Sequence, residues 1–192
     1  YVSFVYQNME FETGEPVGTL LETVCEHGYF EEKDPGLIPE LKRVLELEKL
    51  LGRRMQELSK GEIQRVIIAF AVLYGSKSLM LDEPVFALEQ YQKERIMEYL
   101  TGFAREQGIG MLYSLHELDL AGRYADHIIL FYPAGRSGDR VEVGSVEVMT
   151  SREKLEEAYE VPYDYLRKSE RFYREGLLKI AEQQRQNRYE DR

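Results

Sequence analysis

The chain has almost no cysteine and no long apolar run. Cys25 is the one cysteine among 192 residues, so neither an internal disulfide framework nor a cysteine-based metal site is possible. We interpret Cys25 as a small buried hydrophobic residue, and such cysteine usage as typical of the cytoplasm. The longest apolar run, residues 66–74, is far shorter than the roughly 20 residues that cross a bilayer. These features argue against a disulfide-stapled scaffold and against a membrane-spanning helix within this sequence.

Basic residues are also few. The 25 Lys and Arg are outnumbered by 35 Asp and Glu, which gives a formal net charge of -10 and a pI of about 5.0. Nonspecific nucleic-acid binding relies on Lys and Arg that neutralise phosphates, so we expect no nucleic-acid partner. Hydrophobic residues make up 43% of the chain, enough for a packed core. We therefore expect one globular domain, or one domain with an appendage.

The chain alternates between short apolar runs and helical patterns. This order predicts an α/β fold with a mostly parallel sheet. Thr150 and Glu153 also have the spacing of a capping box at the start of a later helix. The predicted strands are residues 1–6, 79–81, 111–114 and 128–131, and the predicted helices are residues 19–27, 38–51, 59–74, 89–107 and 118–124.

Two adjacent acids follow one of these apolar runs. Asp82 and Glu83 come directly after residues 79–81, which predict a buried strand. Ligands of open α/β sheets bind at the carboxyl ends of the strands. Asp82 is therefore a candidate magnesium ligand, and Glu83 is a candidate general base for an attacking water. An acidic loop that caps the next helix is the open alternative.

The segment Leu-Ser-Lys-Gly-Glu, residues 58–62, begins the predicted helix that runs to Tyr74. Ser59 and Glu62 have the spacing of a capping box, a common helix start. The same geometry suits a phosphate, because Ser59, the Gly61 amide and the positive helix end form an anion site. Gly61 also permits close approach of the backbone. Both interpretations stay open on these residues.

Two further polar residues stand at predicted strand ends. His116 can donate a hydrogen bond to a phosphoryl group during its transfer, or it can be an ordinary turn histidine. Gln7 follows the first strand, and its amide oxygen can join a magnesium shell. His27 and His127 have no comparable context, and no zinc-like spacing links the three histidines.

Together these elements resemble one family, the ATP-binding cassette (ABC) transporter ATP-binding proteins, over about residues 1–165. Their order and spacing are those of the family. Residues 58–62 resemble the signature motif, Asp82-Glu83-Pro84 the Walker B end with its catalytic glutamate, residues 86–89 the D-loop, His116 the switch histidine and Gln7 the Q-loop glutamine.

The resemblance implies a P-loop NTPase-like fold in which two cassettes dimerise head to tail around two ATP molecules. Gln7 and Asp82 would help to hold Mg²⁺, Glu83 would polarise the water, and His116 would contact the γ-phosphate. The implied partners are a second ATPase subunit, as a homodimer or a pair, and transmembrane permease subunits at the cytoplasmic face of the membrane. The residues implied to bind the nucleotide of the opposite subunit are Ser59, Lys60, Gly61 and Glu62.

The sequence departs from the family pattern in three places. No Gly-x-x-x-x-Gly-Lys-Ser/Thr loop occurs in the 192 residues, and because the family places that loop upstream of the Q-loop, we expect it before residue 1. The signature has Lys60 where glycine is usual and Glu62 where glutamine is common, and Lys60 puts a cation near phosphate. The D-loop has Phe86 for serine and Glu89 for aspartate, and the hydroxyl lost at Phe86 puts full turnover in question.

We expect an N-terminally incomplete ABC ATPase domain over residues 1–164, with a helical signature subdomain at about 8–75 and a core at about 76–164. A helical extension is expected at 165–192, with Leu166, Tyr173, Leu177 and Ile180 as its apolar stripe.

Residues 116–132 resemble the corresponding run in the ATPases of iron-siderophore, haem and cobalamin importers. Residues 154–162 resemble the C-terminal helix of the same proteins. This likeness implies import of such a compound or of a metal. Two other functions stay open. One is a catalytically inactive ABC-like interaction module, and the other is a soluble ABC-type ATPase outside transport.

Overall fold

The computed structural model describes residues 2–6, 9, 11, 13–30, 34–134 and 140–166. They belong to two compact units, one that ends at His116 and one that begins at Glu117. Gln7 lies outside the described residues, and so does nearly all of the extension expected at 165–192.

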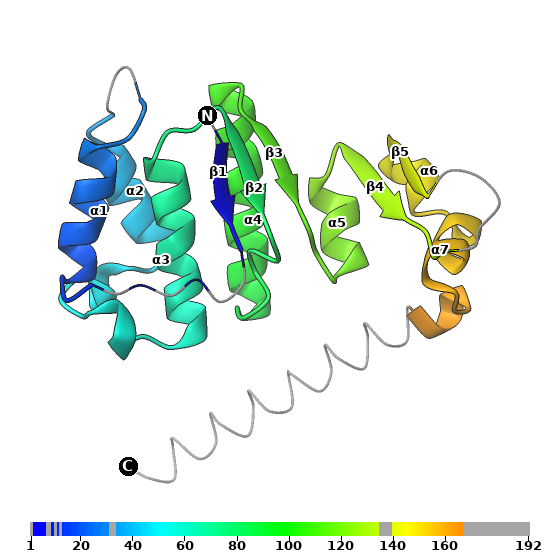
Figure 1. The fold of residues 1–192 in the computed structure, drawn as a ribbon, viewed down its shortest axis with the longest axis horizontal. Coiled ribbons are helices and arrows are strands. Elements are labelled where there is room, and N and C mark those ends of the chain that lie inside the picture. The colour runs from blue at the N-terminus through cyan, green and yellow to red at the C-terminus, as the bar shows by residue number, and fades with distance from the viewer. Residues whose placement is uncertain are drawn as a thin grey trace, which may run out of the picture. The chain divides into compact units, whose positions relative to one another are not determined.

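Unit 1 contains a parallel sheet of three strands, in the order β1-β2-β3. The strands are β1 (Val2–Val5), β2 (Ser78–Leu81) and β3 (Gly110–Tyr113). The register aligns Val5 with Leu81 and Leu81 with Tyr113. All three strands therefore end at the same edge of the sheet (Figure 1), as the sequence predicts for a parallel sheet.

Four helices accompany this sheet: α1 (Val17–Glu26), α2 (Leu37–Val44), α3 (Lys60–Leu73) and α4 (Gln90–Gln107). α4 lies against the sheet (Figure 1) and contains the buried residues Ile96, Met97 and Leu100. It ends at Gly108, whose φ of 63° is left-handed. The predicted helix at 38–51 is wrong in its second half. Glu46 has a φ of 53° that ends α2, and two 3-10 turns follow, η1 (Glu48–Leu50) and η2 (Met55–Glu57).

One face of the unit 1 sheet carries exposed apolar side chains. Phe4, Met80 and Leu112 occupy one register row across the three strands. They are 57%, 38% and 49% exposed. Successive strand residues face opposite sides, and the neighbours Val5, Leu79 and Leu81 are correspondingly buried. We refer to Phe4, Met80 and Leu112 as the apolar row.

Unit 2 contains a two-stranded antiparallel sheet of β4 (His127–Phe131) and β5 (Val141–Ser145). The apolar run at residues 128–131 predicts a core strand of a mostly parallel sheet, but β4 pairs with β5 in the antiparallel direction. The helices are α5 (Leu118–Tyr124), α6 (Val146–Met149) and α7 (Arg152–Tyr159). One cluster of buried residues in the unit consists of Leu130, Tyr132, Met149 and Leu155, and Leu120 on α5 is also buried.

The start of α7 differs from the predicted capping box. Ser151 is the N-cap residue, and its side chain makes no cap hydrogen bond. The Thr150 hydroxyl instead donates to the carbonyl of Val146, at 2.7 Å. Across the described residues, no helix combines the length and apolar character that a bilayer crossing requires.

Candidate functional site

The site is built where β2 and β3 end. The Asp82 amide donates to the Val5 carbonyl at 2.8 Å, and the Ser114 amide donates to the Leu81 carbonyl at 3.0 Å. Strand-like pairing thus continues for one residue beyond each strand. This places Asp82 and Ser114 side by side at the carboxyl edge of the sheet, where α/β proteins bind ligands.

Ser114 connects the two acids. Its hydroxyl donates to Oδ1 of Asp82 at 2.6 Å and accepts from the amide of Glu83 at 2.9 Å. One side chain therefore orients the Asp82 carboxylate and fixes the backbone at Glu83. The sequence interpretation missed Ser114, because a serine that follows an apolar run has no distinguishing pattern.

The Glu83 carboxylate lies against the imidazole of His116. Nε2 of His116 and Oε1 of Glu83 are in direct contact, and the two side chains are 68% and 16% exposed, respectively. Glu83 has a φ of 46°, a left-handed conformation that is uncommon outside glycine and is concentrated at functional sites. The structure therefore brings three sequence-predicted residues, Asp82, Glu83 and His116, to one exposed edge.

A tight loop follows Glu83 and presents Phe86 to His116. In this loop, residues 83–89, the Phe86 amide donates to the Glu83 carbonyl at 3.2 Å. The rings of Phe86 and His116 meet edge to face, with centroids 6.1 Å apart and an interplanar angle of 68°. Such aromatic pairs are favourable beyond the area they bury. Phe86, the departure from the expected serine, therefore helps to hold the His116 ring.

The signature segment, residues 58–62, starts α3 with the predicted capping box. The Glu62 amide donates to the Ser59 hydroxyl at 3.3 Å, and the Ser59 amide donates to Oε2 of Glu62 at 2.8 Å. The hydrogen bond from the Ser59 amide lowers the pKa of Glu62, with smaller help from the Arg53 charge 3.1 Å away. Ser59 and Lys60 are exposed, so the cap leaves this helix start accessible.

Gly61 brings the signature segment against the Glu83 loop. A Cβ atom at Gly61 would lie 2.7 Å from the carbonyl oxygen of Ala87, a distance that backbone cannot accommodate without moving. The sequence predicts that Gly61 allows the backbone to approach a phosphate closely. The structure shows a close approach to the chain's own backbone, which joins the signature segment to the loop that begins at the proposed general base.

The oxygen donors at this edge fit magnesium. Within the described ranges, no cluster of three His, Cys, Asp or Glu residues could hold a metal. Mg²⁺ does not need such a cluster, since it usually takes one or two carboxylates together with waters and substrate phosphates. The exposed Asp82 carboxylate and the Ser114 hydroxyl bonded to it supply hard oxygen ligands of this kind.

Replacing Ser114 with alanine tests its part in the site. If the full-length protein hydrolyses ATP, as the family resemblance implies, Ser114→Ala should lower its kcat about tenfold, because both acids lose their common anchor and small misplacements at a reacting centre are costly. Steady-state ATPase kinetics measure this effect. Ser78→Ala, at the opposite end of β2, is the matched control and should keep wild-type turnover. Equal kcat for the two variants would remove Ser114 from the site.

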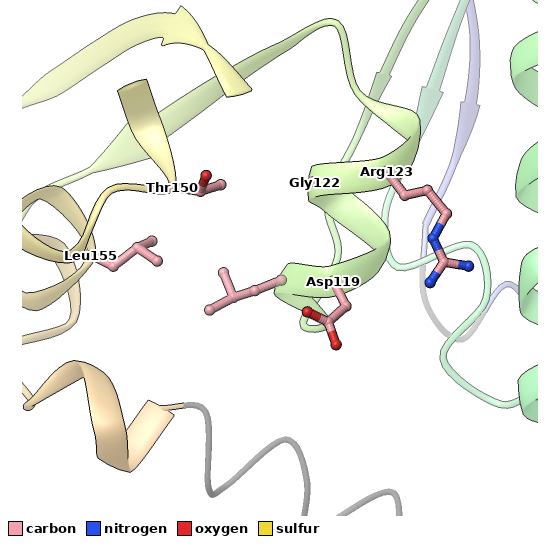
Figure 2. A pocket seen from close by; sticks show the side chains of 6 residues that line it. Asp119, Gly122, Arg123, Thr150 and Leu155 are labelled. Carbon is pink, nitrogen blue, oxygen red and sulfur yellow. The ribbon is translucent and has the colours of Figure 1, made fainter. Parts of the chain in front are cut away.

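Unit 2 has a pocket of its own, of about 310 Å³. Figure 2 shows Asp119 and Arg123 extending from α5, with Thr150 and Leu155 across from this helix. The pocket contains none of the residues that the sequence motifs single out as catalytic or nucleotide-binding. We therefore place the candidate site at the sheet edge of unit 1.

Comparisons with known proteins give consistent matches. Residues 2–86 match the model of the family described as "ABC transporter". The molybdenum import ATP-binding protein ModC of Hahella chejuensis is 34% identical over 146 residues, which make up 73% of this chain and 40% of that protein. The chain therefore spans less than half the length of this relative.

Two solved structures share the fold. The "ATP binding subunit of ABC transporter" gives a TM-score of 0.67 at 22% identity, over 88% of this chain and 67% of the other. A dimeric ATP-binding cassette in a post-hydrolysis state, bound to ADP and Pi, gives 0.57 at 25% identity, over 67% and 57%. These likenesses confirm the predicted P-loop NTPase-like α/β fold.

Proposed function

We propose that this chain, which is part of an ABC transporter ATP-binding domain, belongs to an ATPase that powers import across a membrane. The chain supplies the residues that catalyse hydrolysis, at the carboxyl edge of its sheet. The observation that carries the proposal is the contact between Glu83 and His116 beside Asp82, all at the carboxyl edge of a parallel sheet. A carboxylate, an imidazole and a hard oxygen ligand at that edge suit phosphoryl transfer to water.

Each residue has a distinct part in this reaction. The water oxygen attacks the γ-phosphorus of ATP, the bond to the β–γ bridging oxygen breaks, and Glu83 accepts the water proton as the general base. His116, in contact with Glu83, donates a hydrogen bond to the γ-phosphoryl oxygens, whose charge grows in the transition state. Bound Mg²⁺, held by Asp82 with Gln7, would neutralise charge on the β- and γ-phosphates.

The exposed signature segment serves a second copy. In our proposal, Ser59, Lys60 and Gly61 bind the nucleotide of an opposing ATPase subunit through the positive end of α3. The likeness to a dimeric cassette with ADP and Pi supports this arrangement. The 192 residues contain no Gly-x-x-x-x-Gly-Lys-Ser/Thr loop, so the proposed hydrolysis requires a phosphate cradle from outside these residues.

The transported compound in this proposal contains a metal. One relative is named for molybdenum import, and residues 116–132 resemble the siderophore, haem and cobalamin importers. The proposed partners are transmembrane permease subunits at the cytoplasmic face, which the helical segment at about 8–75 contacts. Stimulation of ATP hydrolysis in the permease complex by molybdate, but not by a ferric siderophore, would assign the first class, and the reverse result the second.

Removal of magnesium tests the proposed ATPase. We expect the purified full-length protein to release phosphate from ATP with Mg²⁺ present, and an excess of EDTA to abolish the release, because the β- and γ-phosphates then lose their counter-charge. Added Mg²⁺ should restore the rate. If the full-length protein binds ATP but releases no phosphate with Mg²⁺ and its permease, the inactive interaction module becomes the better function.

A further inference from the structure

Glu46 has a backbone conformation that glycine adopts more easily. α2 ends with a hydrogen bond from the Leu47 amide to the Lys42 carbonyl, at 2.9 Å, which is the 6→1 bond of a Schellman motif. Glu46 occupies the left-handed position of that motif, with a φ of 53°. This position is usually glycine, since a Cβ atom is disfavoured there. The Glu46 side chain makes contacts that glycine could not make at this position.

The Glu46 carboxylate joins two helices. From α4, Nε2 of Gln92 donates to Oε2 at 2.9 Å, and Nη2 of Arg95 lies 2.9 Å from Oε1. From α3, Nη1 of Arg65 lies 3.4 Å from Oε2. One side chain is thus shared by α3 and α4, and we call it the Glu46 clamp, formed with Arg65, Gln92 and Arg95.

The clamp keeps Glu46 charged. Partial burial raises the pKa of the Glu46 carboxyl, but the Gln92 hydrogen bond and the charges of Arg95 and Arg65 outweigh this, so the pKa lies below its ordinary value. Arg65 also donates to the carbonyls of Leu45 and Glu46, at 2.8 and 3.1 Å. Backbone and side chain at this turn therefore both hold α3.

The two clamped helices lead to the two halves of the proposed site. α3 begins immediately after Ser59, in the signature segment, and α4 begins immediately after the Glu83 loop. At their starts the two parts already meet, because Gly61 approaches the Ala87 carbonyl. The clamp holds α3 and α4 at a second place, at Arg65 on α3 and at Gln92 and Arg95 on α4. Two separate attachments fix a helix direction, whereas one permits it to pivot.

We infer that Glu46 is a positioning residue for ATP hydrolysis. Its carboxylate holds α3 against α4 and so sets how the signature segment stands relative to the loop that carries Glu83. This inference rests on the proposed function. Glu46 is remote from the sheet edge in sequence and touches no reacting atom in the proposed mechanism, so it acts through the two helices.

The substitution Glu46→Gly separates this role from helix capping. Glycine suits the left-handed backbone, so the turn itself should gain stability, while the carboxylate is lost. In the full-length protein we expect kcat for ATP to fall about tenfold, with KM changed less than about twofold because no nucleotide contact is removed. Kinetics per folded protein, with the melting temperature and near-UV circular dichroism, measure this split.

Glu160→Gly is the matched control. Glu160 has a φ of 55° and ends α7. It is exposed, and no described side chain hydrogen-bonds to its carboxylate. The same substitution there should leave kcat unchanged. Equal kcat in wild type, Glu46→Gly and Glu160→Gly would overturn the inference, and so would a fall in kcat that merely tracks the loss of folded protein.

A double-mutant cycle provides the second test. If Glu46 acts through α4, Arg95→Met should lower kcat by a similar factor, and the double variant should be no slower than the slower single one. If the two substitutions lower kcat by factors that multiply in the double variant, Glu46 and Arg95 act independently, and the inference is wrong. A wild-type protein that does not hydrolyse ATP overturns the proposed function together with this inference, whereas an active wild type with an equally active Glu46→Gly overturns the inference and leaves the function intact.

Discussion

Glu83→Gln in the full-length protein should lower ATP turnover by about 100- to 10,000-fold, the usual range for loss of a general base. The amide has the shape of the carboxylate and can still contact His116, but it cannot take the proton of the attacking water. Nucleotide binding does not depend on that proton transfer. The variant should therefore retain ATP and form the head-to-tail dimer more persistently than wild type does, as single-turnover phosphate release and size-exclusion chromatography with ATP would show.

Glu22→Gln is a suitable control for this substitution. Glu22 is exposed on α1, so the variant has the same change of charge and shape away from the sheet edge. It should hydrolyse ATP like wild type. If Glu83→Gln turns over ATP at the rate of Glu22→Gln, another group activates the water, and Glu83 loses its role as the base.

Gly61→Ala should have the second largest effect, a fall in turnover of about 100-fold. The new Cβ would meet the Ala87 carbonyl at 2.7 Å, and backbone on both sides must move to relieve the clash. A displacement of about 1 Å at a reacting centre can cost that factor. Helix propensity acts in the opposite direction, because alanine favours a helix by about 1 kcal/mol over glycine. ATPase assays with a melting curve distinguish the two effects.

Gly52→Ala supplies the comparison for that prediction. A Cβ at Gly52 would meet no atom within 4 Å, so the substitution adds a methyl group without a clash. It should keep both turnover and stability. Wild-type turnover in Gly61→Ala would show that the approach of the signature segment to the Glu83 loop has no part in hydrolysis.

Much of the sheet edge could be predicted from the sequence, because the sequence patterns that indicate it are local. Apolar runs that end in polar residues predict strands whose carboxyl ends share an edge, and Asp82, Glu83 and His116 do meet there. The helix start at Ser59 could also be predicted, since a capping box needs only the spacing to Glu62. The structure shows that the box forms, while its part in nucleotide binding stays a prediction, as does any role of Gln7.

Other features depend on the tertiary structure and could not be predicted. The apolar spacing at residues 38–51 suits one long helix, and nothing local shows that Glu46 takes a left-handed conformation, because the side chains that hold it lie on α3 and α4. Ser114 gains its role only through the register that places it beside Asp82. The apolar run of β4 likewise does not show which strand it pairs with, and the structure pairs it with β5 in the antiparallel direction.

The apolar row has a consequence for the colloidal behaviour of this chain. Phe4, Met80 and Leu112 place three exposed apolar side chains side by side, and contiguous exposed patches of this kind favour association. Among the described residues, β1 and β3 are the edges of their sheet, and unpaired strand edges are templates for further strands. Concentrated preparations of the chain should therefore be limited by self-association before they are limited by unfolding. Met80→Lys would place a charge in the middle of the row, between Phe4 and Leu112.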